Sequence, residues 1–423
     1  MRQPTSLQAW LARLEQLHPT AIELGLERVR RVWQAMRLVP HFPVIVVGGT
    51  NGKGSSCADL EAIFGAAGYR TGLFTSPHLL RYNERVRIGG REASDAELVV
   101  AFEQVDAARG DTSLTYFEFG ALGAVAQFVA AGVDVAILEV GLGGRLDAVN
   151  AFDADVALVT GVDLDHQDYL GDTREAIGFE KAGIYRAGRP AICADPAPPT
   201  SLVAHAQAIG ADLRCLGREF TYEATTDDWA WRGVALNWVE LPHPALAGSF
   251  QLRNAAGVLA VLEAVRERLP VDVGAIRAGL RTVTVPGRFQ LIASAPETIA
   301  DVAHNPEAAR ALAATLRERP ARGRTLAVCG MLADKDAAGV VAALAETVDQ
   351  WWVCAPDSPR ALPATRLAEV VRSRAPGAPV KVEAEARRAL AAARGEARED
   401  DRILVFGSFY TVAAVLDHAA TQQ

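Results

Sequence analysis

The sequence contains no long apolar run. No uncharged stretch approaches the roughly 20 residues that a membrane-spanning helix needs, so the sequence predicts no such helix. The opening stretch, MRQPTSLQAWLARLEQLHP, alternates apolar and charged side chains at helical spacing. It lacks the apolar core and the cleavage site of a secretory signal. We therefore expect a cytoplasmic protein that has no membrane partner.

The chain also lacks an excess of positive charge and any clustering of cysteine. Its 43 lysines and arginines are outnumbered by 51 aspartates and glutamates, and the formal net charge is −8. Because binding to a nucleic-acid backbone depends on concentrated positive charge, we expect no nucleic-acid partner. The five cysteines are far apart and lie mostly in apolar stretches. This spacing predicts reduced, buried thiols rather than disulfides or a zinc site.

What the sequence does contain is a high proportion of apolar residues, 50% of the chain, arranged as apolar strands that alternate with helices. Such alternation is typical of a mostly parallel sheet covered by helices on both faces. The first strand is expected at residues 44–47, and two helices are expected before it. An aromatic, alternating segment at residues 213–238 predicts a short antiparallel sheet. The loop that we predict between residues 196 and 228 has little motif content and is assigned no role.

The motif VPGRF at residues 285–289 predicts a domain boundary, because proline and glycine end a helix there and a new strand–helix series follows. The predicted fold class is α/β, with two domains. Residues 1–286 form a large P-loop-type domain with a mostly parallel sheet flanked by helices, including the N-terminal ones. Residues 287–423 form a smaller, Rossmann-like α/β domain.

A glycine-rich corner, VVGGTNGKGSS, occupies residues 46–56 between a β-branched strand and a helix. Glycines allow backbone N–H groups to converge on an anion, and the helix N-terminus adds a partial positive charge. Lys53 supplies a cation for the outer phosphates of a nucleotide, and Ser55 supplies a hydroxyl for a metal ion. The match to G-x-x-x-x-G-K-[ST] is imperfect, because Gly54 separates Lys53 from Ser55. An ordinary strand–helix turn would need only one or two glycines and would leave Lys53 unexplained.

Polar residues follow three further strands. Glu139 ends one apolar strand, Ser76 and His78 follow another, and the acidic loop VDLDHQDYLG follows a third. The carboxyl ends of parallel strands meet at one edge of a sheet, and Mg²⁺ prefers oxygen ligands, so the pattern predicts a metal site beside the glycine corner. Taken alone, the acidic loop is more simply a solvated surface loop. Its side chains are Asp163, Asp165, His166 and Asp168.

Three cations admit an ordinary surface role. Lys181 lies among apolar neighbours on a predicted helix, and extension of its ammonium into solvent is the simpler interpretation. The same interpretation applies to Arg145 and to Arg288, which lies at the predicted domain boundary. The residues alone leave these alternatives open.

Several motifs together resemble the folylpolyglutamate synthase family, which belongs with the Mur-type amide ligases. In order they are GTNGKGS, SPHLLRYNERVRI, TYFEFG, LEVGLGGRLDAVN, DHQDYLG, EKAGI, PGRFQ, DVAHNP and GSFYTV. They cover nearly the whole chain, and GTNGKGS is the family's own form of the phosphate loop, with its extra glycine. DHQDYLG and SFYTV differ slightly from the expected forms, at positions that do not alter the implied ligands.

The resemblance implies that the chain binds ATP. The residues expected around its phosphates are Thr50, Asn51, Gly52, Lys53, Gly54 and Ser55. The residues expected to contact the rest of the nucleotide are Asn254, Arg288 and Asp301, with His304 nearby.

The resemblance also implies two Mg²⁺ ions and a carbamate on Lys181, formed when carbon dioxide adds to the amine. This expectation replaces the surface interpretation of Lys181 and depends on the resemblance alone. The expected metal ligands are Ser55, Ser76, Glu139, His166 and Lys181. The expected catalytic residues are Lys53, Glu139, His166 and Lys181.

The implied reaction joins L-glutamate to 7,8-dihydropteroate and to reduced folates through an acyl phosphate. The residues that resemble the pterin-binding positions are Ile22, Glu23, Leu24, Thr115, Tyr116, Phe117, Glu118, Leu146, Asp147 and Ala148.

Three alternatives stay open at this point. A monofunctional folylpolyglutamate synthase would lack the dihydropteroate activity. A peptidoglycan-precursor ligase is disfavoured by TYFEFG and SPHLLRYNERVRI. A nucleotide-dependent binding switch would need one metal ion and no carbamate. The family resemblance favours a monomer, and the sequence does not decide whether a monovalent cation assists the reaction.

Overall fold

The computed structural model describes the backbone of residues 4–421 and the side chains through residue 417. The chain divides into two compact units, the first made of residues 1–245 and 252–283 and the second of residues 246–251 and 284–423. Residues 1–3 and 422–423, the ends of the two predicted domain ranges, lie outside the described residues.

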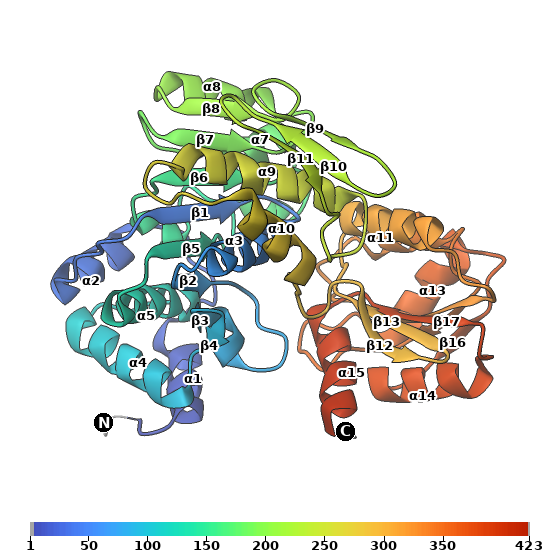
Figure 1. Cartoon of the computed structure of the whole chain (residues 1–423). Helices are drawn as coiled ribbons and strands as arrows, with labels where there is room; N and C mark the ends of the chain where they lie inside the picture. Colours follow the sequence, from blue (N-terminus) through green and yellow to red (C-terminus); the bar gives the residue numbers. More distant parts are fainter. Residues whose placement is uncertain (1–3, 422–423) are drawn as a thin grey trace. The chain divides into compact units, whose positions relative to one another are not determined.

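The first unit is built around an eight-stranded sheet with the strand order β4-β3-β2-β5-β1-β6-β7-β8. Figure 1 shows these strands stacked in that order, from β8 at the top to β4 at the bottom. Six strands are parallel, and the β3–β4 hairpin adds an antiparallel edge. The strands are β1 (Val44–Gly48), β2 (Thr71–Phe74), β3 (Val86–Ile88), β4 (Arg91–Glu92), β5 (Val135–Glu139), β6 (Val156–Val159), β7 (Pro190–Cys193) and β8 (Asp212–Cys215).

Helices cover both faces of this sheet because its central strands are apolar on both sides. In β1, Val44 and Val46 belong to one apolar core, whereas Ile45 and Val47 belong to the core on the other face. The first core includes α1 (Leu7–Leu17), α2 (Glu27–Met36), α4 (Asp95–Arg109), α5 (Tyr116–Ala131), α7 (Arg174–Ala182), α8 (Thr200–Ala208) and η2 (Ala148–Ala151). The second core includes α3 (Lys53–Ala66), α9 (Phe250–Val265) and α10 (Val273–Thr282). The short helices η1 (Tyr82–Arg85) and α6 (Gln167–Leu170) lie in connections between strands.

A separate three-stranded antiparallel sheet packs on α9. Its strands are β9 (Thr221–Ala224), β10 (Trp229–Arg232) and β11 (Asn237–Leu241). The Trp231 indole N–H donates to the carbonyl of Ala256 at 3.0 Å, which fixes the sheet to that helix. The predicted antiparallel sheet is therefore confirmed from β9 onward, whereas the start of the predicted segment is wrong, because residues 213–215 belong to β8 and pair in parallel with β7. The predicted loop at residues 196–228 is wrong, because α8, β8 and β9 occupy it; these elements are too short to give a clear period in the sequence.

The second unit contains a six-stranded sheet in the order β12-β13-β17-β14-β15-β16, parallel except for β12. Its strands are β12 (Gln290–Ser294), β13 (Glu297–Asp301), β14 (Thr325–Cys329), β15 (Gln350–Val353), β16 (Val380–Val382) and β17 (Arg402–Phe406). Its helices are α11 (Pro306–Glu318), α12 (Ala337–Leu344), α13 (Ala364–Arg374), α14 (Ala386–Glu396) and α15 (Phe409–Thr421). The sequence did not reveal β12, which forms a hairpin with β13.

The five cysteines are buried and carry free thiols, as predicted. Among the described residues, no helix is both long enough and apolar enough to cross a membrane.

Candidate active site

The glycine corner connects the end of β1 at Gly48 to the start of α3 at Lys53. Gly49 and Gly52 have φ angles of +145° and +87°. A Cβ at Gly49 would collide with the Thr160 side chain, and a Cβ at Gly52 would collide with the side chain of Asn254. Only glycine fits at these two positions, and the predicted nucleotide-binding Asn254 lies directly against the corner.

Lys53 sits at the first position of α3, over the loop that precedes it. Its ammonium donates to the carbonyls of Gly49 at 2.9 Å and Thr50 at 3.0 Å. The Thr50 hydroxyl donates to the carbonyl of Asp163 at 3.0 Å, which connects the loop to the segment after β6. A cation and the N-terminus of a 14-residue helix thus face the same loop, an arrangement that favours phosphate binding.

The loop lies where the strand order of the sheet reverses. β1 pairs with β5 on one side and with β6 on the other, both in parallel. In open α/β sheets, ligands bind outside the carboxyl ends of the strands at such a switch point. Glu139 ends β5, and residues 160–166 follow β6. The sheet therefore brings the glycine corner, Glu139 and the acidic loop after β6 to the same edge.

Glu139 is 5% exposed, and its carboxylate contacts the segment that follows β2. Its carboxylate accepts a hydrogen bond from the Ser76 backbone N–H at 3.1 Å. A Cβ placed on Gly54 would lie 3.8 Å from the other carboxylate oxygen. Ser55, the next residue of α3, is 3% exposed. The structure therefore brings Ser76 and Glu139 together beside Gly54, the residue that precedes Ser55.

His166 lies on the loop after β6, immediately before α6. It adopts a positive φ of 53°, a conformation that few non-glycine residues take. Its backbone N–H donates to the Asp165 carboxylate at 2.9 Å, and its Nε2 lies 3.9 Å from the same carboxylate. The imidazole is 38% exposed, so a metal ion could approach it from solvent.

Lys181 is 3% exposed, so its interpretation as a surface lysine is wrong. It lies near the end of α7, which packs on the glycine segment after β5. The Arg145 backbone N–H donates to the Glu180 carbonyl at 2.7 Å, and a Cβ on Gly144 would lie 3.0 Å from the Lys181 carbonyl. The ammonium of a lysine is rarely buried without a functional or pairing reason.

The residues at this edge suit a hard cation. The expected set includes two buried groups with oxygen donors, Ser55 and Glu139, and oxygen is the donor that Mg²⁺ prefers. Among the described residues, no group of three or more histidine, cysteine, aspartate or glutamate side chains is arranged to hold a metal ion. The expected set contains only two such side chains, Glu139 and His166, so its remaining donors must come from hydroxyls, a modified lysine or the nucleotide itself.

The three predicted substrate-binding segments also meet in the first unit. The Gly25 backbone N–H donates to the Leu146 carbonyl at 3.1 Å. The Arg28 guanidinium contacts the Glu23 carboxylate and donates to the Glu118 carboxylate at 3.0 Å. Arg28 thus connects two of the segments, although nothing in its sequence neighbourhood identified it.

Within these segments, Glu118 and Asp147 bind backbone as well. Glu118 accepts the Thr115 N–H at 2.7 Å, which caps the start of α5. Asp147 is 3% exposed and accepts the backbone N–H groups of Leu142 at 2.8 Å and Val149 at 3.1 Å. Burial raises the pKa of Asp147 to about 7, although the backbone hydrogen bonds oppose the shift.

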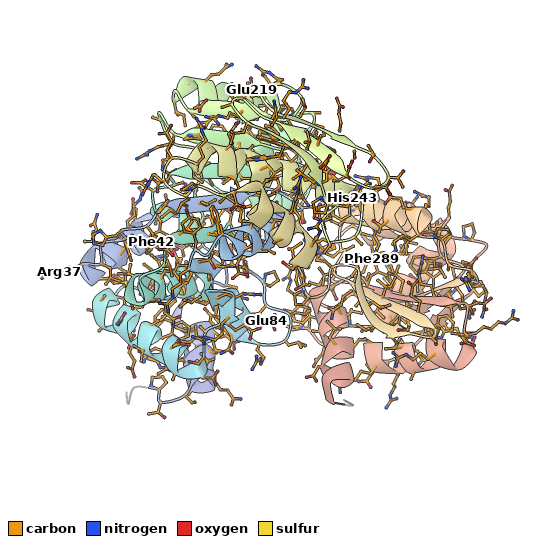
Figure 2. All side chains as sticks on the ribbon, viewed as in Figure 1. Arg37, Phe42, Glu84, Glu219, His243 and Phe289 are labelled. Carbon is orange, nitrogen blue, oxygen red and sulfur yellow. The ribbon has the colours of Figure 1, made fainter. Side chains whose placement is uncertain are left out.

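A cation surrounded by aromatic rings lies beside the predicted Tyr116. Arg85 stacks on the rings of Tyr82 and Tyr116, each at 5.4 Å, and its Nε donates to Nδ1 of His78 at 2.8 Å. Burial and the nearby guanidinium lower the pKa of His78 to about 4. Glu84, labelled in Figure 2, holds the His78 loop by accepting three consecutive backbone N–H groups, those of residues 79–81. Sequence reasoning singled out His78 but not Arg85.

The remaining predicted nucleotide residues form a cluster of their own in the second unit. Asp301 accepts backbone N–H groups from Phe289 and Ala303, each at 2.8 Å. Burial raises the pKa of Asp301, and the positive charge of Arg288 opposes this shift. Arg288 and His304 both lie against Phe409, with ring-centre distances of 5.9 Å and 6.0 Å.

Two family models match the chain. The Mur ligase middle domain matches residues 47–194, and the Mur ligase glutamate ligase domain matches residues 287–409. The dihydrofolate synthase/folylpolyglutamate synthase of Escherichia coli K12 is 46% identical over 413 residues, which are 97% of this chain and 95% of that protein.

The chain belongs to the dihydrofolate synthase/folylpolyglutamate synthase family. The solved structure of E. coli FolC in complex with DHPP and ADP has a TM-score of 0.94 at 44% identity, with 100% of this chain and 99% of that chain covered. A solved bifunctional folylpolyglutamate synthase/dihydrofolate synthase with Mn, AMPPNP and L-glutamate bound has a TM-score of 0.91 at 45% identity, with 100% of both chains covered. These findings confirm the predicted family, the α/β fold class and the assignment to the ATP-dependent ligases.

Proposed function

We propose that this chain joins L-glutamate to 7,8-dihydropteroate, giving dihydrofolate, and adds further glutamates to tetrahydrofolates. Both reactions are ATP-dependent amide ligations that pass through an acyl phosphate. The observation that carries the proposal is the position of Lys53 and Glu139. Lys53 starts the helix after a glycine loop, and the Glu139 carboxylate lies against the same loop at Gly54. A phosphate-binding cation and a metal-binding carboxylate therefore share one strand edge.

ATP would lie with its phosphates on the loop of residues 49–55. Lys53 would exchange its two loop carbonyls, at 2.9 and 3.0 Å, for phosphate oxygens, and the backbone N–H groups at the start of α3 would bind the same anion. Asn254, which packs on Gly52, would fix the adjoining part of the nucleotide. We assign Arg288, Asp301 and His304 of the second unit to the same nucleotide.

Magnesium would be held by Ser55, Ser76, Glu139, His166 and a carbamate of Lys181, in two sites. When bound, such ions neutralise charge on the phosphoryl group as it is transferred. The low exposure of Lys181 favours the carbamate, because carbon dioxide converts a buried cation into an anion that a divalent ion stabilises. Calorimetric titrations with and without potassium would show whether a monovalent cation contributes.

The acceptor would lie along the segments containing Glu23, Glu118 and Leu146. Arg28 contacts two of these segments, and this supports a role for its guanidinium in orienting the polar edge of a pterin ring. The rings around Arg85 offer flat surfaces for an aromatic acceptor. His78 is neutral near pH 7, because its pKa is about 4, and therefore adds no positive charge beside the acceptor.

The reaction balances in two steps. An oxygen of the acceptor carboxylate attacks the γ-phosphorus of ATP, the bond to the β,γ-bridging oxygen breaks, and ADP leaves. The uncharged amine of glutamate then attacks the acyl carbon, inorganic phosphate leaves, and the amine proton passes to solvent or phosphate. Lys53 stabilises the charge that develops on the transferred phosphoryl group.

The test is a substrate panel with purified protein, ATP, Mg²⁺ and L-glutamate. Phosphate release with dihydropteroate and also with tetrahydrofolate, with amide products of the expected mass, supports the bifunctional assignment. Turnover on tetrahydrofolate alone would instead identify a monofunctional folylpolyglutamate synthase. ATP binding without turnover on either acceptor would favour the binding switch. Light scattering of the same sample tests the expected monomer, and fractionation of cells tests the expected cytoplasmic location.

A further inference from the structure

A cavity of about 560 Å³ opens in the first unit at the amino ends of the central strands. Val44 is the first residue of β1, Ala136 is the second residue of β5, and Asp155 immediately precedes β6. The glycine loop follows the opposite end of β1, which is five residues long. At about 3.3 Å per residue, the cavity and the loop are roughly 15 Å apart, so this cavity is distinct from the candidate active site.

The cavity has an apolar floor and an aromatic wall. Trp33 of α2 meets Phe152 edge to face, with ring centroids 5.0 Å apart and an interplanar angle of 86°. Phe42, labelled in Figure 2, also lines the cavity. A wall of this kind suits a flat ring, because aromatic groups attract one another in offset and edge-to-face arrangements. The floor is formed by Val44, Val125, Ala136 and Leu138.

The charged side chains at the cavity differ in how they are paired. Asp155 accepts the Val44 N–H at 2.9 Å and pairs with Arg268 at 2.7 Å. Asp153 pairs with Arg186 at 3.0 Å. Within the described part of the chain, no oxygen accepts a hydrogen bond from the guanidinium of Arg30, which lines the same cavity. The two carboxylates are therefore neutralised already, whereas Arg30 keeps its donors for an anion.

We propose that this cavity is a second ligand site, which binds a small planar aromatic monoanion such as a bicyclic carboxylate. The ring would lie over the apolar floor beside Trp33 and Phe42, and the carboxylate would accept hydrogen bonds from Arg30. The volume lies within the range of about 300–1,000 Å³ typical of small-molecule sites. A polyphosphate does not fit this chemistry, because one unpaired cation stands beside two carboxylates.

The test compares two probes of nearly equal size, 2-naphthoate and its neutral analogue 2-naphthalenemethanol, by saturation-transfer NMR and calorimetry on the full chain. We expect naphthoate to bind with a dissociation constant on the order of 0.1–1 mM and the alcohol to bind at least about fivefold more weakly. Because the cavity is separate from the nucleotide loop, saturating ATP and Mg²⁺ should leave the naphthoate affinity unchanged.

Two arginines on α2 supply a matched pair of variants. Arg30→Ala should weaken naphthoate binding about five- to tenfold without changing the affinity for the alcohol. Both arginines are exposed, but Arg31→Ala should change neither affinity, because Arg31 does not line the cavity.

Three results would overturn the proposal. One is the absence of naphthoate binding to the wild-type chain. Another is equal affinity for the two probes, which would indicate apolar partitioning alone. The third is displacement of naphthoate by ATP or dihydropteroate, which would place the probe in the candidate active site. The wild-type comparison of the two probes requires no variant to fold.

Discussion

The proposed nucleotide loop and the proposed acceptor segments of the first unit are held in shape by different interactions. The loop is held mainly by backbone geometry, with Gly49 and Gly52 packed against other side chains and Lys53 bonded to loop carbonyls. The acceptor segments are connected by charged side chains far apart in sequence, such as Arg28 and Glu118. One change of a loop residue should therefore abolish the chemistry, whereas a change at Arg28 should mainly weaken acceptor binding.

The largest effect is expected at the loop. Lys53→Ala should lower ligase turnover by about a thousandfold or more, because the transferred phosphoryl group loses its cation. Phosphate release measures the turnover, and a thermal melt should show that the variant is folded. Lys381→Ala, on the edge strand of the second unit's sheet, is the matched control and should keep wild-type activity. Wild-type turnover in Lys53→Ala would contradict the assignment of the loop.

The helix that carries the loop should limit stability at high pH. Asp59 of α3 is fully buried, neither of its carboxylate oxygens has a hydrogen-bond partner in the described structure, and burial raises its pKa to about 8. Between pH 4 and 8 the folded chain holds a proton that the unfolded chain releases, so stability falls as pH rises through this window. The loss amounts to roughly 4 kcal/mol between pH 5 and 8.

Asp59→Asn should remove that slope, as measured by chemical unfolding at a series of pH values. An unchanged slope in the variant would show that Asp59 has an ordinary pKa. In that case the loop helix would not carry the buried neutral acid that the structure indicates.

Ligase turnover should depend on carbon dioxide, which would carbamylate Lys181 at the edge of the sheet beside the loop. If Lys181 is carbamylated, buffer depleted of bicarbonate at pH 7 should lower turnover about a hundredfold, because a metal ligand is lost. Restored bicarbonate should return the activity, and ¹³C-labelled bicarbonate should give a carbamate NMR signal that is absent in Lys181→Gln. Full activity after depletion, without a carbamate signal, would exclude the modification.

A substitution in the acceptor segments should change the kinetics less than Lys53→Ala does. Arg28→Ala should raise KM for dihydropteroate about tenfold, because Glu23 and Glu118 lose the cation between them, while KM for ATP stays unchanged. Steady-state kinetics with each substrate varied in turn measures the split, and Arg31→Ala is the control on the same helix. A rise in KM for ATP as well would show that the two regions are not independent.

Local sequence was enough to predict the loop and the edge of the sheet. A β-branched strand, a glycine corner and a helix are adjacent in the chain, and the position of Glu139 follows because parallel strands end at one edge. The carbamate on Lys181, in contrast, was suggested only by family resemblance. Its burial depends on the packing of α7 against Gly144, which lies far from it in sequence.

Long-range pairing explains what was missed. Arg28 contacts Glu118 across 90 residues. Arg85 of η1 stacks on Tyr116 of α5, which lies far along the chain. The β3–β4 hairpin and β12 are short antiparallel strands at sheet edges, where one face is polar and the apolar period is weak. Neither feature leaves a local signal in the sequence.

The most direct test of the nucleotide loop is calorimetric titration of ATP, with Mg²⁺ present, into the wild-type chain and into Lys53→Ala. We expect the wild type to bind with a dissociation constant on the order of 1–100 µM and the variant to bind at least about tenfold more weakly. An absence of heat with the wild type at every Mg²⁺ concentration, or equal affinities for the two proteins, would contradict the proposed nucleotide site.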